Sequence, residues 1–110
     1  MASTPEGKVK AAIRKELTQR GIWHYIAAAG PYSVHGIPDI VCVWQGRALY
    51  IEVKAPGKRK GTTANQQRML RQIADAGGIA CVVDSVEQIK EILSEGPDQA
   101  TRDPFDFERA

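Results

Sequence analysis

The sequence holds few of the residues on which several classes of protein depend. Two cysteines and two histidines in 110 residues are too few, and too far apart, for a zinc site or a disulfide-stabilised scaffold. No apolar run approaches the roughly 18–20 residues that cross a bilayer, and the first residues lack the apolar stretch of a signal peptide. We therefore expect a cytoplasmic protein that does not act in a membrane, with Cys42 and Cys81 serving as small buried apolar residues.

The distribution of charge is more informative than its sum. The formal net charge is only +2, and the 43% apolar and 25% charged residues are typical of one globular domain of this length. Basic residues gather in the middle of the chain, at Lys54, Lys58, Arg59, Lys60, Arg68 and Arg71. Acidic residues outnumber basic ones in residues 94–110. This asymmetry predicts a partner that is anionic where it meets the middle of the chain.

Apolar periodicity and turn residues divide the chain into helices and strands. Thr4 is suited to cap a first helix and Gly21 to end it. The expected helices are 5–20, 64–76 and 86–93, and the expected strands are 22–26, 39–44, 48–54 and 79–83. The order α-β-β-β-α-β-α predicts an α/β fold whose mixed central sheet is flanked by helices. Residues 1–93 should form this single domain, and residues 94–110 a loosely ordered acidic tail that contains proline.

Three charged residues stand in strands that otherwise read as buried. Asp39 opens the first strand of the expected hairpin, and Glu52 and Lys54 lie two apart on the second, so their side chains share a face. If Gly46 lies near the centre of the hairpin turn, Asp39 falls opposite roughly Val53. Two carboxylates and one ammonium group are therefore predicted to converge at one end of the hairpin.

Phosphodiester hydrolysis is a chemistry that needs such a trio. A divalent cation neutralises the phosphate and lowers the pKa of a bound water, and Mg²⁺ is usually held by one or two carboxylates. Asp39 and Glu52 supply carboxylates, and the backbone carbonyl of Val53 offers a neutral oxygen. Lys54 is placed to orient or deprotonate the attacking water, or to stabilise the transition state. We expect Mg²⁺ as the cofactor, with Mn²⁺ able to substitute.

These motifs resemble a known family of nucleases. Pro38-Asp39 followed, after a hairpin, by Glu52-Val53-Lys54 is similar to the PD-(D/E)xK signature. The residues around them resemble its virus-type replication-repair (VRR-NUC) branch. They are the Gly36-Ile37-Pro38-Asp39 approach, Lys54-Ala55 and the Gly- and Lys-rich loop, Gln66 on the next helix, and Gly77-Gly78 before an apolar strand. The resemblance spans roughly residues 8–93 and implies a restriction-endonuclease-like core.

The resemblance implies roles for individual residues. Asp39 and Glu52 match the metal-binding acids and Lys54 the catalytic lysine. Glu16 matches an acid that many members add to the metal site from the first helix, and Gln66 matches a glutamine that supports catalysis. The resemblance to stand-alone bacterial and viral members implies a homodimer that cuts branched DNA, such as four-way (Holliday) junctions, in replication and repair. It also implies that this chain acts in a bacterial or phage-infected cell.

A set of residues beside the trio is expected to contact DNA. These are Lys58, Arg59 and Lys60, with Arg68, His35 and Ser33. Lysines and arginines that pair with phosphates give affinity that depends on salt and little on base sequence. The simpler alternative for the basic run is a solvated loop without a partner.

Each residue of the site also has a plain structural alternative. Glu52 and Lys54 would be a surface ion pair on a solvated strand, Asp39 a turn residue, and Glu16 and Gln66 exposed helix residues. Two other functions remain open beside a structure-selective endonuclease. One is a nuclease-like module that binds DNA without cutting it, and the other is a less structure-selective restriction or repair enzyme.

Overall fold

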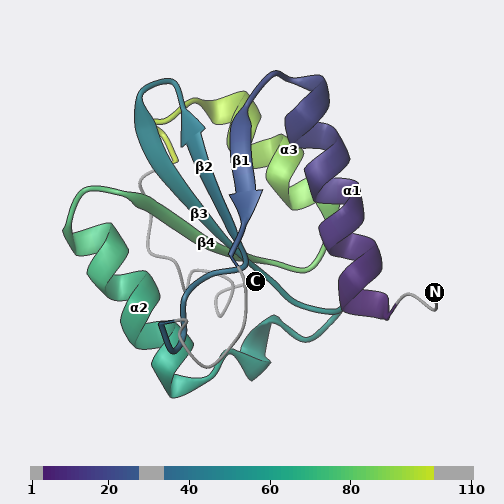
Figure 1. The fold of residues 1–110 in the computed structure, drawn as a ribbon, viewed down its shortest axis with the longest axis vertical. Helices are drawn as coiled ribbons and strands as arrows, with labels where there is room; N and C mark the ends of the chain where they lie inside the picture. The colour runs from purple at the N-terminus through teal and green to yellow at the C-terminus, as the bar shows by residue number, and fades with distance from the viewer. Residues whose placement is uncertain (1–3, 28–33, 101–110) are drawn as a thin grey trace.

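The computed structural model describes residues 4–27 and 34–100. The elements run in the order α1 (Pro5–Gln19), β1 (Trp23–Ile26), β2 (Ile40–Trp44), β3 (Arg47–Val53), a short 3-10 helix η1 (Arg59–Gly61), α2 (Ala64–Asp75), β4 (Ile79–Val83) and α3 (Val86–Glu95) (Figure 1). Apart from the short η1, this is the expected α-β-β-β-α-β-α order. In the described residues, no helix is long and apolar enough to cross a membrane.

The four strands form one mixed sheet in the order β1-β2-β3-β4. β1, β2 and β3 are antiparallel neighbours, whereas β3 and β4 are parallel and joined by the crossover that contains α2. Ile40 pairs with Ile51, so one step further along Asp39 lies across from Glu52. The sequence-based register put Asp39 opposite roughly Val53, which is one residue from this position. The hairpin turn contains two residues, Gln45 and Gly46, both with positive φ, and its centre lies between them.

Helices cover the sheet unequally, as Figure 1 shows. α1 and α3 pack on one face and enclose the main core, to which the sheet contributes residues such as Leu49, Ile51 and Val53. α2 packs on the opposite face against β4, where Leu70 meets Ala80 and Val82. Because side chains alternate along a strand, Glu52 lies on the α2 face between the two core residues Ile51 and Val53.

The start of α2 is determined by a reciprocal cap. The Thr63 hydroxyl accepts the backbone N–H of Gln66, and the Gln66 side-chain oxygen accepts the backbone N–H of Thr63 at 2.9 Å. This capping box satisfies two N–H groups that have no partner inside the helix. It also holds the Gln66 side chain at the end of α2 that lies closest to Glu52.

The C-terminal boundary of the domain differs from the prediction. α3 continues to Glu95, and Ala100 is buried in the main core. The Ala100 N–H donates to the carbonyl of Gly96 at 3.1 Å. The expectation of a loose tail from residue 94 is therefore wrong for residues 94–100, because this segment adds apolar surface to the core. Residues 101–110 lie outside the described part of the chain.

Gly36 connects the loop before Asp39 to the start of α2. Its φ is +80°, and a Cβ atom built on it would lie 2.5 Å from the carbonyl oxygen of Asn65. No side chain fits at that distance, so glycine allows the two backbones to touch. The contact places the approach to Asp39 against the same helix end that carries Gln66.

Replacing Gly36 with alanine should therefore destabilise the domain through both conformation and contact. Gly57 is a matched control, since its φ is +79° with nothing within 4 Å of the added Cβ. We expect Gly57→Ala to cost about 1 kcal/mol for the left-handed backbone alone, and Gly36→Ala to cost about 1–3 kcal/mol more because the backbones must separate. Urea unfolding of both variants measures the difference, and equal losses would contradict the close contact.

Candidate active site

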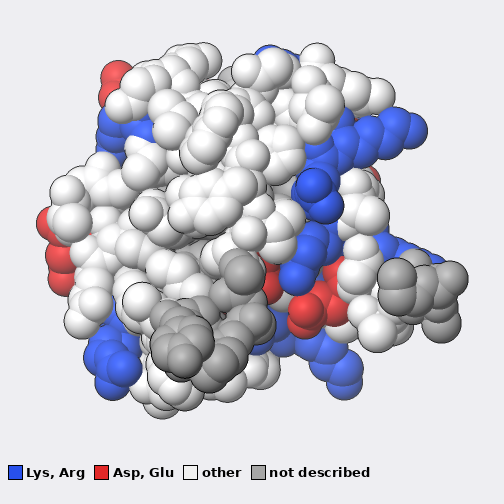
Figure 2. All heavy atoms as spheres, viewed as in Figure 1, with Lys and Arg blue, Asp and Glu red and all other residues white. Residues whose placement is uncertain are grey.

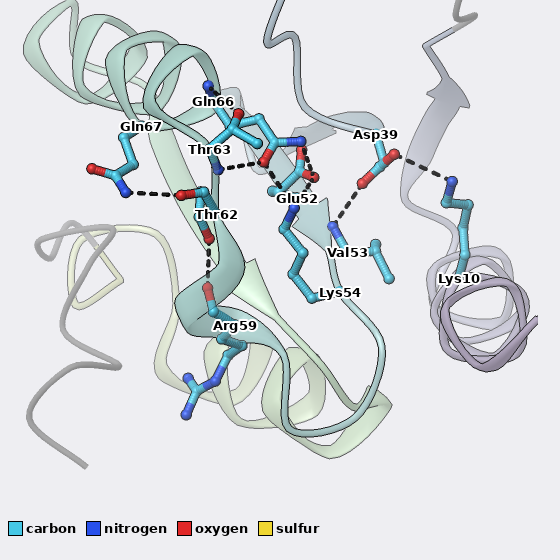
Figure 3. Close-up of polar contacts among 10 residues, drawn as sticks. All are labelled: Lys10, Asp39, Glu52, Val53, Lys54, Arg59, Thr62, Thr63, Gln66 and Gln67. Atoms are coloured by element: carbon cyan, nitrogen blue, oxygen red, sulfur yellow. Dashed lines mark hydrogen bonds and ion pairs between the residues drawn. The ribbon is translucent and has the colours of Figure 1, made fainter.

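Asp39 is held at the start of β2 by two groups on opposite sides. Its Oδ2 accepts the backbone N–H of Val53 at 2.8 Å, and its Oδ1 lies 3.2 Å from the Nζ atom of Lys10 on α1 (Figure 3). The Asp39 side chain is 23% exposed. The backbone of β3 therefore fixes the orientation of this carboxylate, while Oδ1 faces the ammonium group of Lys10.

Glu52 is a buried carboxylate beside Asp39. It is 3% exposed, and its Oε2 accepts a hydrogen bond from Gln66 Nε2 at 3.0 Å and lies 3.5 Å from Lys54 Nζ. The pKa of Glu52 is raised to about 8, first by burial and then by the negative charge of Asp39, while Lys54 opposes the shift. The cluster therefore resists carrying both negative charges when no added cation is present.

Lys54 and Gln66 form the other side of the cluster. Lys54 Nζ donates to Gln66 Oε1 at 2.8 Å, and the same oxygen accepts the Thr63 N–H of the cap. Gln66 Nε2 donates to Glu52. The amide of Gln66 thus joins the acid and the lysine, and the reciprocal cap restricts its own motion.

These contacts suit a hard divalent cation that binds oxygen. Two carboxylates lie side by side at one end of the neighbouring strands β2 and β3. Their mutual repulsion is one cause of the raised pKa of Glu52. A divalent cation between them would relieve that repulsion, and carboxylate oxygens are the ligands that Mg²⁺ prefers. Figure 2 shows acidic atoms on this face bordered by lysine and arginine atoms. The carbonyl of Val53 as a further ligand stays a prediction.

Glu16 does not join this cluster. Its carboxylate lies 2.6 Å from Arg20 Nε and 3.9 Å from Lys90 Nζ on α3, and the hydrogen bond from Arg20 lowers the pKa of Glu16. Among the described residues, no three acidic, histidine or cysteine side chains form a metal-binding group. The expected metal-ligand role for Glu16 therefore has no geometric support.

The residue of α1 that reaches the site is Lys10, which sequence reasoning missed. Lys10 lies six positions before Glu16, or about 9 Å along a helix, so the two residues meet different neighbours. Lys10 stands three residues before the buried Ile13, at the margin of the apolar stripe. That position was the available signal, since a residue there lies close to the sheet.

The residues expected to contact DNA divide into three groups. Lys58, Lys60, Arg68 and His35 are exposed. Arg59 instead lies with its Nε 3.7 Å from Oδ1 of Asp84, which also accepts the Gly57 N–H through Oδ2 at 2.8 Å. Asp84 therefore anchors the basic loop, which gives Arg59 a structural contact. Ser33 lies outside the described residues.

Comparison with solved structures finds a domain of the same fold. The match is to a structure described as "VRR_NUC domain", with a TM-score of 0.67 and 23% sequence identity, covering 84% of this chain and 97% of that chain. No protein-family model matches the chain, and no curated protein matches it. The chain therefore has the fold of a VRR_NUC domain, as its motifs predict.

The raised pKa of Glu52 predicts a pH dependence of stability without metal. In the unfolded chain this carboxyl titrates near its ordinary value of 4.5, and in the folded protein near about 8. Between these values the folded state binds more protons, so the free energy of unfolding should fall as the pH rises from 4.5 to 8. Glu52→Gln should remove this contribution, on the order of a few kcal/mol. Denaturant unfolding in EDTA across this range measures it.

The exposed Glu87 on α3 provides the control for that experiment. Glu87→Gln makes the same chemical change away from the site and should leave the pH dependence as in the unmodified protein. If Glu52→Gln keeps the same slope as well, the carboxyl of Glu52 does not have the raised pKa described above.

Proposed function

We propose that this protein is a divalent-metal-dependent DNA endonuclease that hydrolyses phosphodiester bonds. One observation carries the proposal: Asp39 lies across the hairpin from the buried Glu52, and Lys54 is tied to Glu52 through Gln66. The VRR_NUC fold supports it, together with the position of Asp39 and Glu52 at the same end of β2 and β3.

The roles follow from the contacts. Asp39 and Glu52 would hold Mg²⁺, or Mn²⁺ in its place, and the bound ion would supply a Lewis acid that neutralises phosphate charge and acidifies water. Lys54, 13% exposed, presents its ammonium beside these acids, where it orients the attacking water or stabilises charge on the phosphate. Gln66 keeps Lys54 in that position. Lys58 and Lys60, exposed on the loop that follows, would pair with the DNA backbone.

Branched DNA such as a four-way junction is the substrate class that we propose. The motif resemblance supports it, together with a role in replication or repair. A junction has two-fold symmetry and requires two cuts, and a C2 homodimer supplies two active sites. Light scattering after size-exclusion chromatography tests this part, and a monomer at micromolar concentration would contradict it.

Asp39→Ala and Lys54→Ala should each reduce cleavage by at least about 100-fold, because each removes a group that acts on the reacting phosphate. The assay compares plasmid, linear duplex and four-way junction with Mg²⁺ or Mn²⁺. Lys15→Ala, at an exposed position of α1, should cleave like the unmodified protein.

Two results would overturn the nuclease proposal, and a third would overturn only the preference for branched DNA. Undiminished cleavage by folded Asp39→Ala and Lys54→Ala would place the chemistry elsewhere. Gel-shift binding of DNA without cleavage under either metal would instead favour a DNA-binding module of nuclease-like fold, and equal cleavage of all three substrates would favour a less structure-selective enzyme.

A further inference from the structure

Lys10 is a second lysine at the site, and its surroundings differ from those of Lys54. Lys54 is 13% exposed and contacts both Glu52 and Gln66. Lys10 is 26% exposed, and in the described part of the chain its ammonium pairs with Asp39 alone. Figure 3 shows it approaching Asp39 from α1, on the side away from Glu52 and Lys54.

The two oxygens of Asp39 have separate partners. Oδ2 receives the backbone N–H of Val53, a contact that a rigid strand maintains. Among the described residues, the cation that Oδ1 contacts is the flexible side chain of Lys10. Oδ1 is therefore the oxygen that can change its partner without any movement of the sheet.

A divalent cation on Asp39 competes with Lys10 for the same charge. The metal-free cluster combines two carboxylates with two ammonium groups, so its net charge is zero when both acids are ionised and positive when Glu52 is protonated. An added divalent ion would make it strongly positive, and two cations a few ångströms apart repel each other. Because lysine carries a compact charge on a flexible four-carbon stem, Lys10 can move away while its backbone stays in α1.

We propose that Lys10 holds Oδ1 of Asp39 in the metal-free protein, yields it to a divalent cation, and then pairs with a phosphate of the bound DNA. This inference rests on the proposed function. It gives Lys10 opposite effects on the two ligands, since the lysine opposes metal binding and favours DNA binding. A purely structural support of Asp39 would favour metal binding instead.

Lys10→Met tests this proposal by two binding measurements that do not require cleavage. Mn²⁺ affinity without DNA is measured by calorimetry or electron paramagnetic resonance, and we expect it to tighten about two- to fivefold, the range of a partly exposed ion pair. Affinity for a four-way junction is measured in Ca²⁺ over a range of salt concentrations. The affinity for the junction should weaken. The slope of log K against log salt, which is negative, should become shallower by about 0.9, which corresponds to the loss of one phosphate contact.

Two further variants separate charge from structure. Lys15→Met makes the same substitution at an exposed position of α1 and should change neither affinity. Lys10→Arg keeps the positive charge, so it should keep the salt slope of DNA binding and should not tighten Mn²⁺ binding as Lys10→Met does. Circular dichroism and thermal unfolding verify that each variant is folded, and Lys10→Gln replaces Lys10→Met if the latter is not.

The possible failures are distinguishable. Weaker or unchanged Mn²⁺ binding by Lys10→Met, or an unchanged salt slope, would overturn the role of Lys10 while leaving the nuclease proposal intact. If the unmodified protein binds no Mn²⁺, both proposals fail. Tighter Mn²⁺ binding with a reduced salt slope, in a protein that cleaves no DNA, would support Lys10 and overturn only the nuclease activity.

Discussion

The buried carboxylate of Glu52 is the constraint on which the arrangement around it depends. A carboxyl group with 3% exposure is costly to ionise unless hydrogen bonds and opposite charge compensate the negative charge. Gln66 and Lys54 supply both, and the start of α2 must lie within hydrogen-bond reach of β3 for this to happen. The capping box and the backbone contact at Gly36 therefore serve the site as much as the fold, because they determine where α2 begins.

The site combines fixed and exchangeable contacts. Gln66, at the capped end of α2, holds Glu52 and Lys54. The backbone N–H of Val53, in the sheet, holds one oxygen of Asp39. The other oxygen of Asp39 pairs with a flexible lysine from α1. A site built in this way keeps its acids in place for a metal ion while leaving one position where charge can be exchanged.

Much of the fold and the centre of the site could be predicted from the sequence. Apolar runs and capping residues indicated the helices and strands, and the two-residue spacing of Glu52 and Lys54 placed them on one face. Local patterns were sufficient for these features because alternation along a strand and turn length are local properties. The difference of one residue in the register came from the turn. The turn consists of Gln45 and Gly46, both with positive φ, so its centre is the peptide bond between them and not Gly46 itself.

The sequence by itself determined that Asp39, Glu52 and Lys54 share one end of a hairpin, since chain connectivity brings them together. Only the tertiary structure decided which residue of α1 reaches that end. The answer is Lys10 and not Glu16, because the rotation and axial position of a helix on a sheet depend on packing with distant elements such as α3. The same reason applies to Arg59, which pairs with Asp84 directly after the end of β4. It also applies to Ala100, which is buried although it lies beyond the expected end of the domain.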